Sequence, residues 1–418
     1  ATTLKRRFFG DLNRAIWTKE IEVPYLDINY SKGGLTPIKK GGGMQTISLR
    51  LEGGDGNQYV LRKIQKDATY LVEKDLRNTI AQDLVLDGIA GSHPYASIVI
   101  PKFADAVSVY HTNPKLVYVP ADSSLGIYKD EFGGSFCLFE ERPNDDMSEF
   151  SSFGNSKKVV NTSKTIKKVH GKHDHVIDVN YTIRARLLDM IIGDWDRHDD
   201  QWRWATFKSD DGTYYRPIPR DRDQAFFMFD GFFPKITNRK WALKKFQSFE
   251  PDIRDVAGLN FNARYFDRSF LTAADHETWL SIADSMQNEI TDEVILSAIN
   301  KFPKEAIEIN GDYLISTLKY RRDNLKNTTT EYYQILAKEV DVVGTTNDDY
   351  FEIDRVNSDT VTVKIYSRKN KKKKKGTKYF ERTFVKNETK EIRIYGLGGN
   401  DEYKIKGNVS SSILVRIV

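Results

Sequence analysis

Two acidic clusters, far apart along the chain, carry the residue types best suited to chemistry. The first lies in segment 193–198 and contains Asp196; the second, segment 220–223, contains Asp221 and Asp223. Hard divalent cations prefer carboxylate oxygen, and a cation bound to nucleotide phosphates takes only one or two carboxylates from the protein. The two clusters together therefore predict a site for a cation that carries a phosphate group.

A simpler interpretation of the same residues stays open. The clusters also contain arginines, at Arg197, Arg220 and Arg222. A surface loop in which the acids pair with these neighbouring guanidinium groups would need no ligand.

The elements around the clusters would bring them together. Apolar residues recur at helical spacing from Ile183 to Ile191, which predicts an amphipathic helix beginning near Thr182, and Gly193 suits its left-handed C-terminal cap. Residues 201–219 predict a β-hairpin around a turn at Asp210–Gly212, since turn residues there separate two strand-like runs. This hairpin would return Asp221 to the side of Asp196.

A glycine-rich turn lies upstream, between predicted strands. Three strand-like runs are residues 35–40, 46–51 and 59–64. Gly41, Gly42 and Gly43 lie between the first two runs, and glycines let backbone N–H groups approach phosphate oxygens without an intervening side chain. The alternative is an ordinary hairpin, because the spacing Gly-x-Gly-x-x-Gly is absent.

The motifs together resemble a known group of enzymes. A helix ending in Leu-Asp-Met, then Gly-Asp-Trp-Asp-Arg-His, then an Asp-x-Asp-x-Ala-Phe segment, is similar to the catalytic core of atypical protein-kinase-like folds. The nearest likenesses are the spore-coat CotH kinases, the Golgi casein kinase family and, more distantly, HipA. The resemblance implies that Asp196 is the catalytic aspartate and that Asp221, with Asp223 close by, binds metal. Gln201 stands where typical kinases place a metal-binding Asn, which is a departure from the pattern.

The resemblance also implies a cation on the third strand that holds the phosphates, with a Glu partner on the next helix. Arg62, Lys63 and Lys66 compete for the first role; strand alternation sends Arg62 and Lys63 to opposite faces, and Arg62 is favoured because Val60 shares its face. A helix expected at Tyr70–Ile89 would supply Glu73 as the partner. Residues 136–143, including Glu140, resemble the strand-to-hinge passage at which kinases bind adenine.

The remaining sequence predicts an α+β chain with a bilobal kinase-like domain and a small all-β domain. The expected divisions are an N-terminal arm (1–34), a strand-rich lobe with one long helix (35–143), a helical lobe with the catalytic loop (144–327) and the all-β domain (328–418). Within these, residues 96–101 read as a strand and residues 144–180 as a mobile polar insert. His170, His173 and His175 in that insert are read either as a metal site or as solvated residues.

Composition limits the classes of function. The formal net charge of +5 is mild, much of it in Lys371–Lys375, and gives no indication of nucleic-acid binding. That lysine run is read as a solvated hairpin tip or as a contact for anionic lipid. No run of eighteen apolar residues is present, so no transmembrane helix is expected. Cys137 is the only cysteine, which excludes an internal disulfide and leaves the redox compartment open.

A wider resemblance covers nearly the whole chain. The sequence segments 33–37, 41–46, 110–120 and 394–401 are similar to segments of a family of large Bacteroidetes proteins. In that family a metallophosphoesterase domain precedes this region and an outer-membrane β-barrel follows. The resemblance implies a location at the periplasmic face or surface of an outer membrane, with the barrel as a partner in the same chain or complex.

The leading expectation is a kinase-like phosphotransferase that uses ATP bound to Mg²⁺ or Mn²⁺, with the acceptor undetermined. The alternative is a catalytically degenerate kinase-like module that binds or assembles within a larger outer-membrane-associated protein. A lipid-facing adaptor that uses the lysine run is a third interpretation. Paired acids favour the enzyme, whereas Gln201 and Arg62 at the position of the usual Lys favour the degenerate module.

Overall fold

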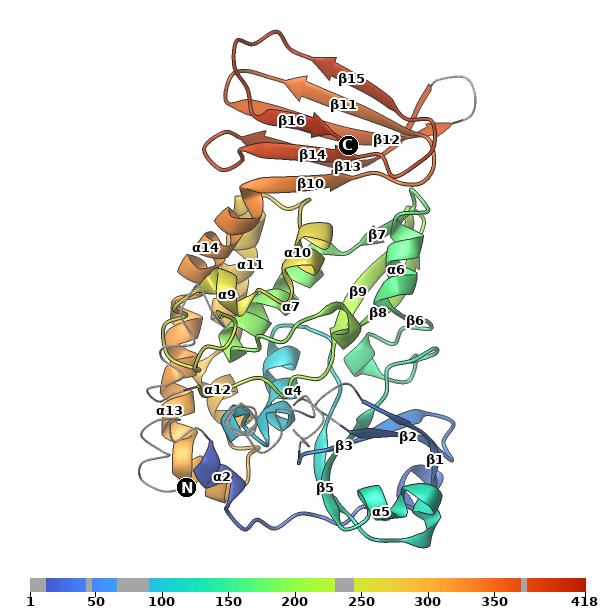
Figure 1. The fold of residues 1–418 in the computed structure, drawn as a ribbon, viewed down its shortest axis with the longest axis vertical. Helices are drawn as coiled ribbons and strands as arrows, with labels where there is room; N and C mark the ends of the chain where they lie inside the picture. Colours follow the sequence, from blue (N-terminus) through green and yellow to red (C-terminus); the bar gives the residue numbers. More distant parts are fainter. Residues whose placement is uncertain (1–12, 43–46, 66–89, 230–243, 370–373) are drawn as a thin grey trace, which may run out of the picture.

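The structure is a computed structural model that describes residues 13–42, 47–65, 90–229, 244–369 and 374–418. A strand-rich lobe, a mainly helical lobe and a second strand-rich region follow one another along the longest axis (Figure 1). The α+β class expected from the sequence, with a bilobal domain and a C-terminal β domain, is confirmed.

The first lobe is built on one antiparallel sheet with the strand order β1-β2-β3-β5-β4. Its strands are β1 (Leu35–Gly41), β2 (Ser48–Gly53), β3 (Gln58–Lys63), β4 (Lys115–Val119) and β5 (Ser135–Glu141). Alternation along β2 and β3 buries Leu49, Leu51 and Leu61 against the short helices η4 (Ser123–Tyr128) and α5 (Lys129–Phe132). The opposite face of the sheet therefore carries Arg50 and Arg62 toward the second lobe.

The prediction of a strand at residues 96–101 is wrong, because this segment forms the first part of helix α4 (Ala96–Ala106). Val99, Ile100 and Phe103 are buried at helical spacing in the core of the second lobe. A short apolar run fits a buried strand and a buried helix equally well, so local pattern alone could not separate the two. The helix expected at Tyr70–Ile89 lies outside the described residues.

The second lobe holds the predicted catalytic segment. Helix α7 (Val179–Ile192) begins at Asp178, whose side chain accepts a hydrogen bond from the Tyr181 N–H, and ends at Gly193, with φ +71°. The predicted hairpin is confirmed as β8 (Trp202–Ser209) paired antiparallel with β9 (Gly212–Pro219). The helix end and the hairpin end thus carry the two acidic clusters.

The segment expected as a mobile insert, residues 144–180, instead forms regular structure. It contains η5 (Ser151–Phe153), β6 (Val159–Asn161), α6 (Thr162–Val169) and β7 (His175–Ile177). Strands β6 and β7 flank the hairpin in a sheet of order β6-β8-β9-β7. Polar residues are used here as caps: Asn161, for example, accepts the Lys164 N–H at the start of α6.

Helices complete the second lobe and its main hydrophobic core. They are α2 (Arg14–Trp17), η6 (Asp199–Gln201), α9 (Val256–Leu259), α10 (Arg264–Phe270), α11 (His276–Glu289), α12 (Asp292–Ile299), α13 (Lys304–Asp323) and α14 (Leu325–Ala337). Over the part of the chain that is described, no helix is both long and apolar enough to cross a bilayer.

The β domain begins later than expected, because α14 continues to Ala337 and the first strand is β10. One sheet is formed by β10 (Glu339–Val343), β14 (Glu391–Tyr395) and β16 (Leu414–Ile417), which pair in parallel in this order. A second sheet, of order β13-β12-β11-β15, is formed by β11 (Asp349–Arg355), β12 (Thr360–Lys369), β13 (Lys374–Val385) and β15 (Glu402–Lys406).

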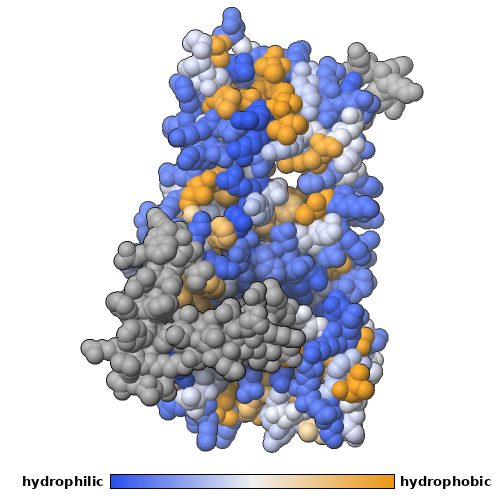
Figure 2. Space-filling view, in the orientation of Figure 1, coloured by the Kyte–Doolittle hydropathy of each residue, from blue (hydrophilic) through white to orange (hydrophobic). Residues whose placement is uncertain are grey.

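The outer surface is mostly hydrophilic in the view of Figure 2, with apolar side chains in small groups, several of them over the β domain. Exposed apolar residues of this domain include Ile405, Leu414 and Ile417 on the last two strands.

Candidate active site

The two acidic clusters line one cleft between the lobes, with a volume of ≈ 670 Å³. Its first wall comes from β1, β2 and β3 with the turn after β1, and its second wall from the end of α7 and the hairpin β8–β9. The sequence-predicted site residues that line it are Gly41, Gly42, Arg62, Asp196, Gln201, Asp221 and Asp223. Gly43, Lys66 and Glu73 lie outside the described residues.

Asp196 is held by two amide side chains. Its Oδ1 accepts a hydrogen bond from Asn262 Nδ2 at 2.6 Å, and its Oδ2 accepts one from Gln201 Nε2 at 3.4 Å. Its backbone N–H donates to Asp194 Oδ1 at 3.1 Å, which fixes the turn after α7. No motif marks Asn262 in the sequence, since it stands on the segment between α9 and α10 and reaches Asp196 only through the tertiary fold.

The amide oxygen of Gln201 is already engaged. Gln201 Oε1 accepts a hydrogen bond from Arg197 Nη1 at 2.8 Å. This oxygen is the only side-chain atom of glutamine that could bind a cation. In the structure it accepts a hydrogen bond from Arg197, while the amide nitrogen of Gln201 donates to Asp196.

Arg197 joins the two acidic clusters. Its Nη1 also donates to the backbone oxygen of Arg220 at 2.8 Å and lies 3.2 Å from Asp194 Oδ2. The Arg220 N–H in turn donates to the backbone oxygen of Gln201 at 2.9 Å. The Asp196 segment and the Asp221 segment are therefore fixed to each other by a buried guanidinium group and by the main chain.

The simpler interpretation, acids paired with neighbouring arginines, holds for the buried acids beneath the cleft. Asp189 contacts Arg186 Nη1 at 2.7 Å, Arg197 Nε at 3.4 Å and Arg222 Nη2 at 2.9 Å. Asp194 also lies in this layer; burial raises its pKa to about 7, although Arg197 acts in the opposite direction. Asp196 has no ion pair with a described arginine and faces the cleft.

Asp221 adopts a left-handed backbone conformation, with φ +59°. Aspartate tolerates this region better than most residues, and such conformations concentrate at functional sites because the surrounding structure must hold them. Its Oδ2 lies 3.1 Å from Arg62 Nη1. The strand cation and the second acidic cluster thus meet directly in the cleft.

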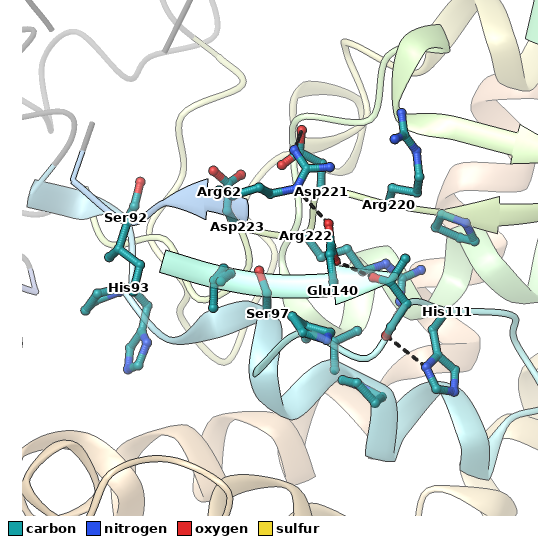
Figure 3. A pocket seen from close by; sticks show the side chains of 18 of the residues that line it. Arg62, Ser92, His93, Ser97, His111, Glu140, Arg220, Asp221, Arg222 and Asp223 are labelled. Atoms are coloured by element: carbon teal, nitrogen blue, oxygen red, sulfur yellow. Dashed lines mark hydrogen bonds and ion pairs between the residues drawn. The ribbon is translucent and has the colours of Figure 1, made fainter. Parts of the chain in front are cut away.

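Arg62 is held from the other side by Glu140. Arg62 Nε donates to Glu140 Oε1 at 2.7 Å, and Thr112 Oγ1 donates to Glu140 Oε2 at 2.6 Å. Burial lowers the pKa of Arg62, but Asp221 and Glu140 outweigh burial and raise the pKa above its usual value. Figure 3 shows Glu140 below Arg62, with Asp221 and Asp223 nearby.

The expected contact of the passage around Glu140 with a nucleotide base stays a prediction, and the structure gives the Glu140 side chain a further contact, with Arg62. Its side chain provides the acidic partner of the strand cation, which is the role expected for Glu73. Lys63, on the opposite face of β3, donates to the backbone oxygen of Glu131 at 2.8 Å and so points away from the cleft.

The donor set fits a phosphate-bound cation better than a protein-only metal centre. Within the described ranges, no group of three or more His, Cys, Asp or Glu side chains converges as it would to hold a metal ion. Mg²⁺ on nucleotide phosphates uses one or two carboxylates, which Asp221 and Asp223 can supply. The histidines expected as an alternative metal site have separate partners, His173 with Asp349 and His175 with Tyr215.

Comparisons with known proteins give similarity to solved kinase structures at the level of the fold alone. The Helicobacter pylori proinflammatory kinase CtkA matches with 12% identity over 74% of this chain and 98% of that chain, at a TM-score of 0.36. The Golgi casein kinase matches with 11% identity over 77% and 76%, at 0.31, and the Rio2 kinase of Chaetomium thermophilum with 12% identity over 71% and 73%, at 0.28. No protein-family model matches the chain, and no curated protein matches it at a significant level.

Proposed function

We propose that this protein is a kinase-like phosphotransferase that uses a nucleoside triphosphate bound to Mg²⁺ or Mn²⁺. One observation carries the proposal: Asp196 and Asp221, distant in sequence, line a single cleft in which Arg62 contacts Asp221. A cleft of ≈ 670 Å³ falls within the range of small-molecule sites.

The residues of the chain have distinct roles in this proposal. The acceptor hydroxyl approaches Asp196, which orients it and takes its proton while the hydroxyl oxygen bonds to the terminal phosphorus. The bond from that phosphorus to the bridging oxygen breaks, and the nucleoside diphosphate leaves. Arg62 binds phosphate oxygens, and the backbone at Gly41 and Gly42 approaches them closely. When bound, the cation neutralises charge on the phosphates, and Asp221 and Asp223 would hold it.

Positioning supplies most of the proposed catalysis, because phosphoryl transfer needs little covalent chemistry from the protein. Asn262 and Gln201 hold the Asp196 carboxylate, and the Glu140 carboxylate holds Arg62. A reactive carboxylate and a phosphate-binding cation fixed by separate hydrogen bonds suit such a reaction.

The test combines binding with transfer. Thermal-shift titration with ATP and Mn²⁺ or Mg²⁺ is expected to stabilise the wild type, and Asp221→Asn is expected to lose the metal-dependent part of the shift. Asn is the chosen replacement because it also tolerates a left-handed backbone. Transfer of labelled phosphate by the wild type and its loss in Asp196→Asn would establish the enzyme, whereas the absence of any metal-dependent nucleotide shift would reject it.

One observation favours a second candidate, a catalytically degenerate binding or assembly module. The Gln201 amide oxygen is bound to Arg197, so a second cation would have one fewer ligand than in a typical kinase. Nucleotide binding without phosphate transfer to any acceptor, with retained binding in Asp196→Asn, would support the module. The outer-membrane setting and the barrel partner stay predictions that rest on sequence resemblance.

A further inference from the structure

The cleft is lined by several arginines in addition to Arg62. Its lining includes the arginines Arg50, Arg62, Arg142, Arg203 and Arg220. They come from β2, β3, the end of β5, β8 and the end of β9, so four separate segments beyond β3 contribute a guanidinium group. Among them, only Arg62 forms an ion pair with a described carboxylate.

The other arginines contact neutral acceptors where they have described partners. Arg142 Nη1 donates to Gln58 Oε1 at 2.6 Å, Arg203 Nη1 donates to the Trp202 backbone oxygen at 2.8 Å, and Arg220 Nη2 donates to the Asp200 backbone oxygen at 3.0 Å. These contacts hold the side chains in place without neutralising their charge.

The guanidinium groups also lie close enough to repel one another. Burial and then the neighbouring Arg50 lower the pKa of Arg142, with Arg203 acting in the same direction. Burial also lowers the pKa of Arg203; Asp200 acts in the opposite direction, and Arg50 and Arg62 add to the lowering. Arg142 and Arg203 are half-buried and form no direct ion pair with a described carboxylate, so an anion bound between these guanidinium groups would relieve their mutual repulsion.

The sheet geometry places this set on the cleft face. Arg50 pairs in register with Val60, and Val60 pairs with Glu140, so these residues share one face of the sheet. Arg142 follows β5, where its N–H donates to the Gln58 backbone oxygen. Along the sheet, Arg50 therefore lies level with Val60, two residues from Arg62, and Arg142 lies level with Gln58, two residues further from Arg62 and its Asp221 contact.

The lining of the cleft is unusual for the apolar end of a nucleotide. Ligand pockets are lined mainly by hydrophobic and aromatic side chains, yet among the described lining residues only Val60 has an apolar side chain. The neighbouring pocket behind Arg62 and Glu140 has more apolar lining, but its volume of ≈ 40 Å³ is too small for a purine ring.

We propose that Arg50, Arg142 and Arg203 form a second phosphate-binding subsite, so that the cleft takes a second phosphate group beside the one at Arg62 and Asp221. This inference deepens the proposed function, and rests on it for the first phosphate site at Asp221. The second phosphate comes either from a longer polyphosphate donor or from a phosphorylated acceptor; both present the same oxygen atoms to the guanidinium groups.

The probe is inorganic tripolyphosphate, measured by titration calorimetry at low salt in the presence of EDTA. The wild type is expected to bind it without metal, and Arg50→Gln, Arg142→Gln and Arg203→Gln are each expected to weaken binding by on the order of tenfold. Arg268→Gln is the matched control, since Arg268 is half-buried and contacts a backbone oxygen, that of Glu339, outside the cleft. Metal-free binding that is absent in the wild type, or equal in the wild type and the three cleft variants, would overturn the proposal.

Additional binding measurements distinguish a failure of this inference from a failure of the proposed function. They also identify the source of the second phosphate. Asp221→Asn is expected to lose the metal-dependent ATP shift but to retain metal-free tripolyphosphate binding. Adenosine alone is expected not to bind; adenosine binding as tight as that of ATP would contradict the subsite. Competition between tripolyphosphate and ATP–Mn²⁺ indicates a polyphosphate donor, whereas simultaneous binding indicates a phosphorylated acceptor.

Discussion

Arg62 and Glu140 stand on neighbouring strands, with Arg62 Nε 2.7 Å from Glu140 Oε1. The same guanidinium group reaches Asp221 Oδ2 at 3.1 Å. The sheet therefore supplies both Arg62, the proposed phosphate-binding cation, and an acid that orients it.

Removing the charge of Glu140 tests this relationship. Glu140→Gln keeps an acceptor but loses the charge-assisted bond, so stability is expected to fall by about 1–2 kcal/mol because both side chains are largely buried. Nucleotide affinity is expected to fall as well, since Arg62 then turns more fully toward Asp221. Denaturant unfolding and ATP–Mn²⁺ titration measure the two effects. The control is Glu141→Gln, on the opposite face of β5, which should leave nucleotide affinity unchanged.

Asn262 gives a separate test of how Asp196 is positioned. Asn262→Ala removes the 2.6 Å hydrogen bond to Asp196 Oδ1, and turnover is expected to drop by on the order of tenfold while the Kd for nucleotide stays the same. Asn262→Asp places a like charge against Asp196 and is expected to shift the acidic limb of the pH–rate profile upward. Steady-state kinetics over pH measures both variants. A loss of nucleotide binding equal to the loss of turnover would indicate a general folding defect instead.

Gly193 caps α7, the helix that precedes Asp196, and a substitution there tests how this helix end is packed. At φ +71°, an added Cβ would lie 2.8 Å from Phe249 Cδ2 and 3.0 Å from Arg321 Nη1. Gly193→Ala is therefore expected to cost about 2–3 kcal/mol, from backbone strain together with a steric clash. Gly56→Ala is the matched control: its φ is +79°, but no atom lies within 4 Å of the added Cβ. Equal losses in thermal stability for the two variants would contradict the packing part of this explanation.

The raised pKa of Asp194 makes the free energy of unfolding depend on pH. Burial raises its pKa from 3.8 to about 7, so the folded state holds this proton more tightly than the unfolded state does. The contribution is fully present below about pH 4 and is lost as the pH rises through about 7, at a rate of up to about 1.4 kcal/mol per pH unit. Asp194→Asn does not titrate, so the stability of the wild type relative to this variant is expected to fall between pH 4 and pH 8. Unfolding curves at several pH values measure the difference, and a constant difference would contradict the assignment.

Local patterns in the sequence were enough to predict the elements that carry the site. Apolar spacing and the cap at Gly193 predicted α7, and two strand-like runs around a turn predicted the hairpin β8–β9. These elements depend on contacts between residues near one another in the chain, which periodicity and turn chemistry record directly. Strand alternation likewise separated Arg62 from Lys63, as their different partners reflect.

Which side chains meet in the cleft depends on long-range contacts, which become visible in the folded chain. The contact of Asn262 with Asp196, the pairing of Glu140 with Arg62 and the arginine set around Arg203 join segments that no local pattern relates. Residues 96–101 were misread because a short apolar run is buried equally well as a strand or a helix. Long-range packing selects between such conformations. Local patterns were therefore sufficient for most elements and their reactive residues, whereas the partners of those residues follow from the folded arrangement.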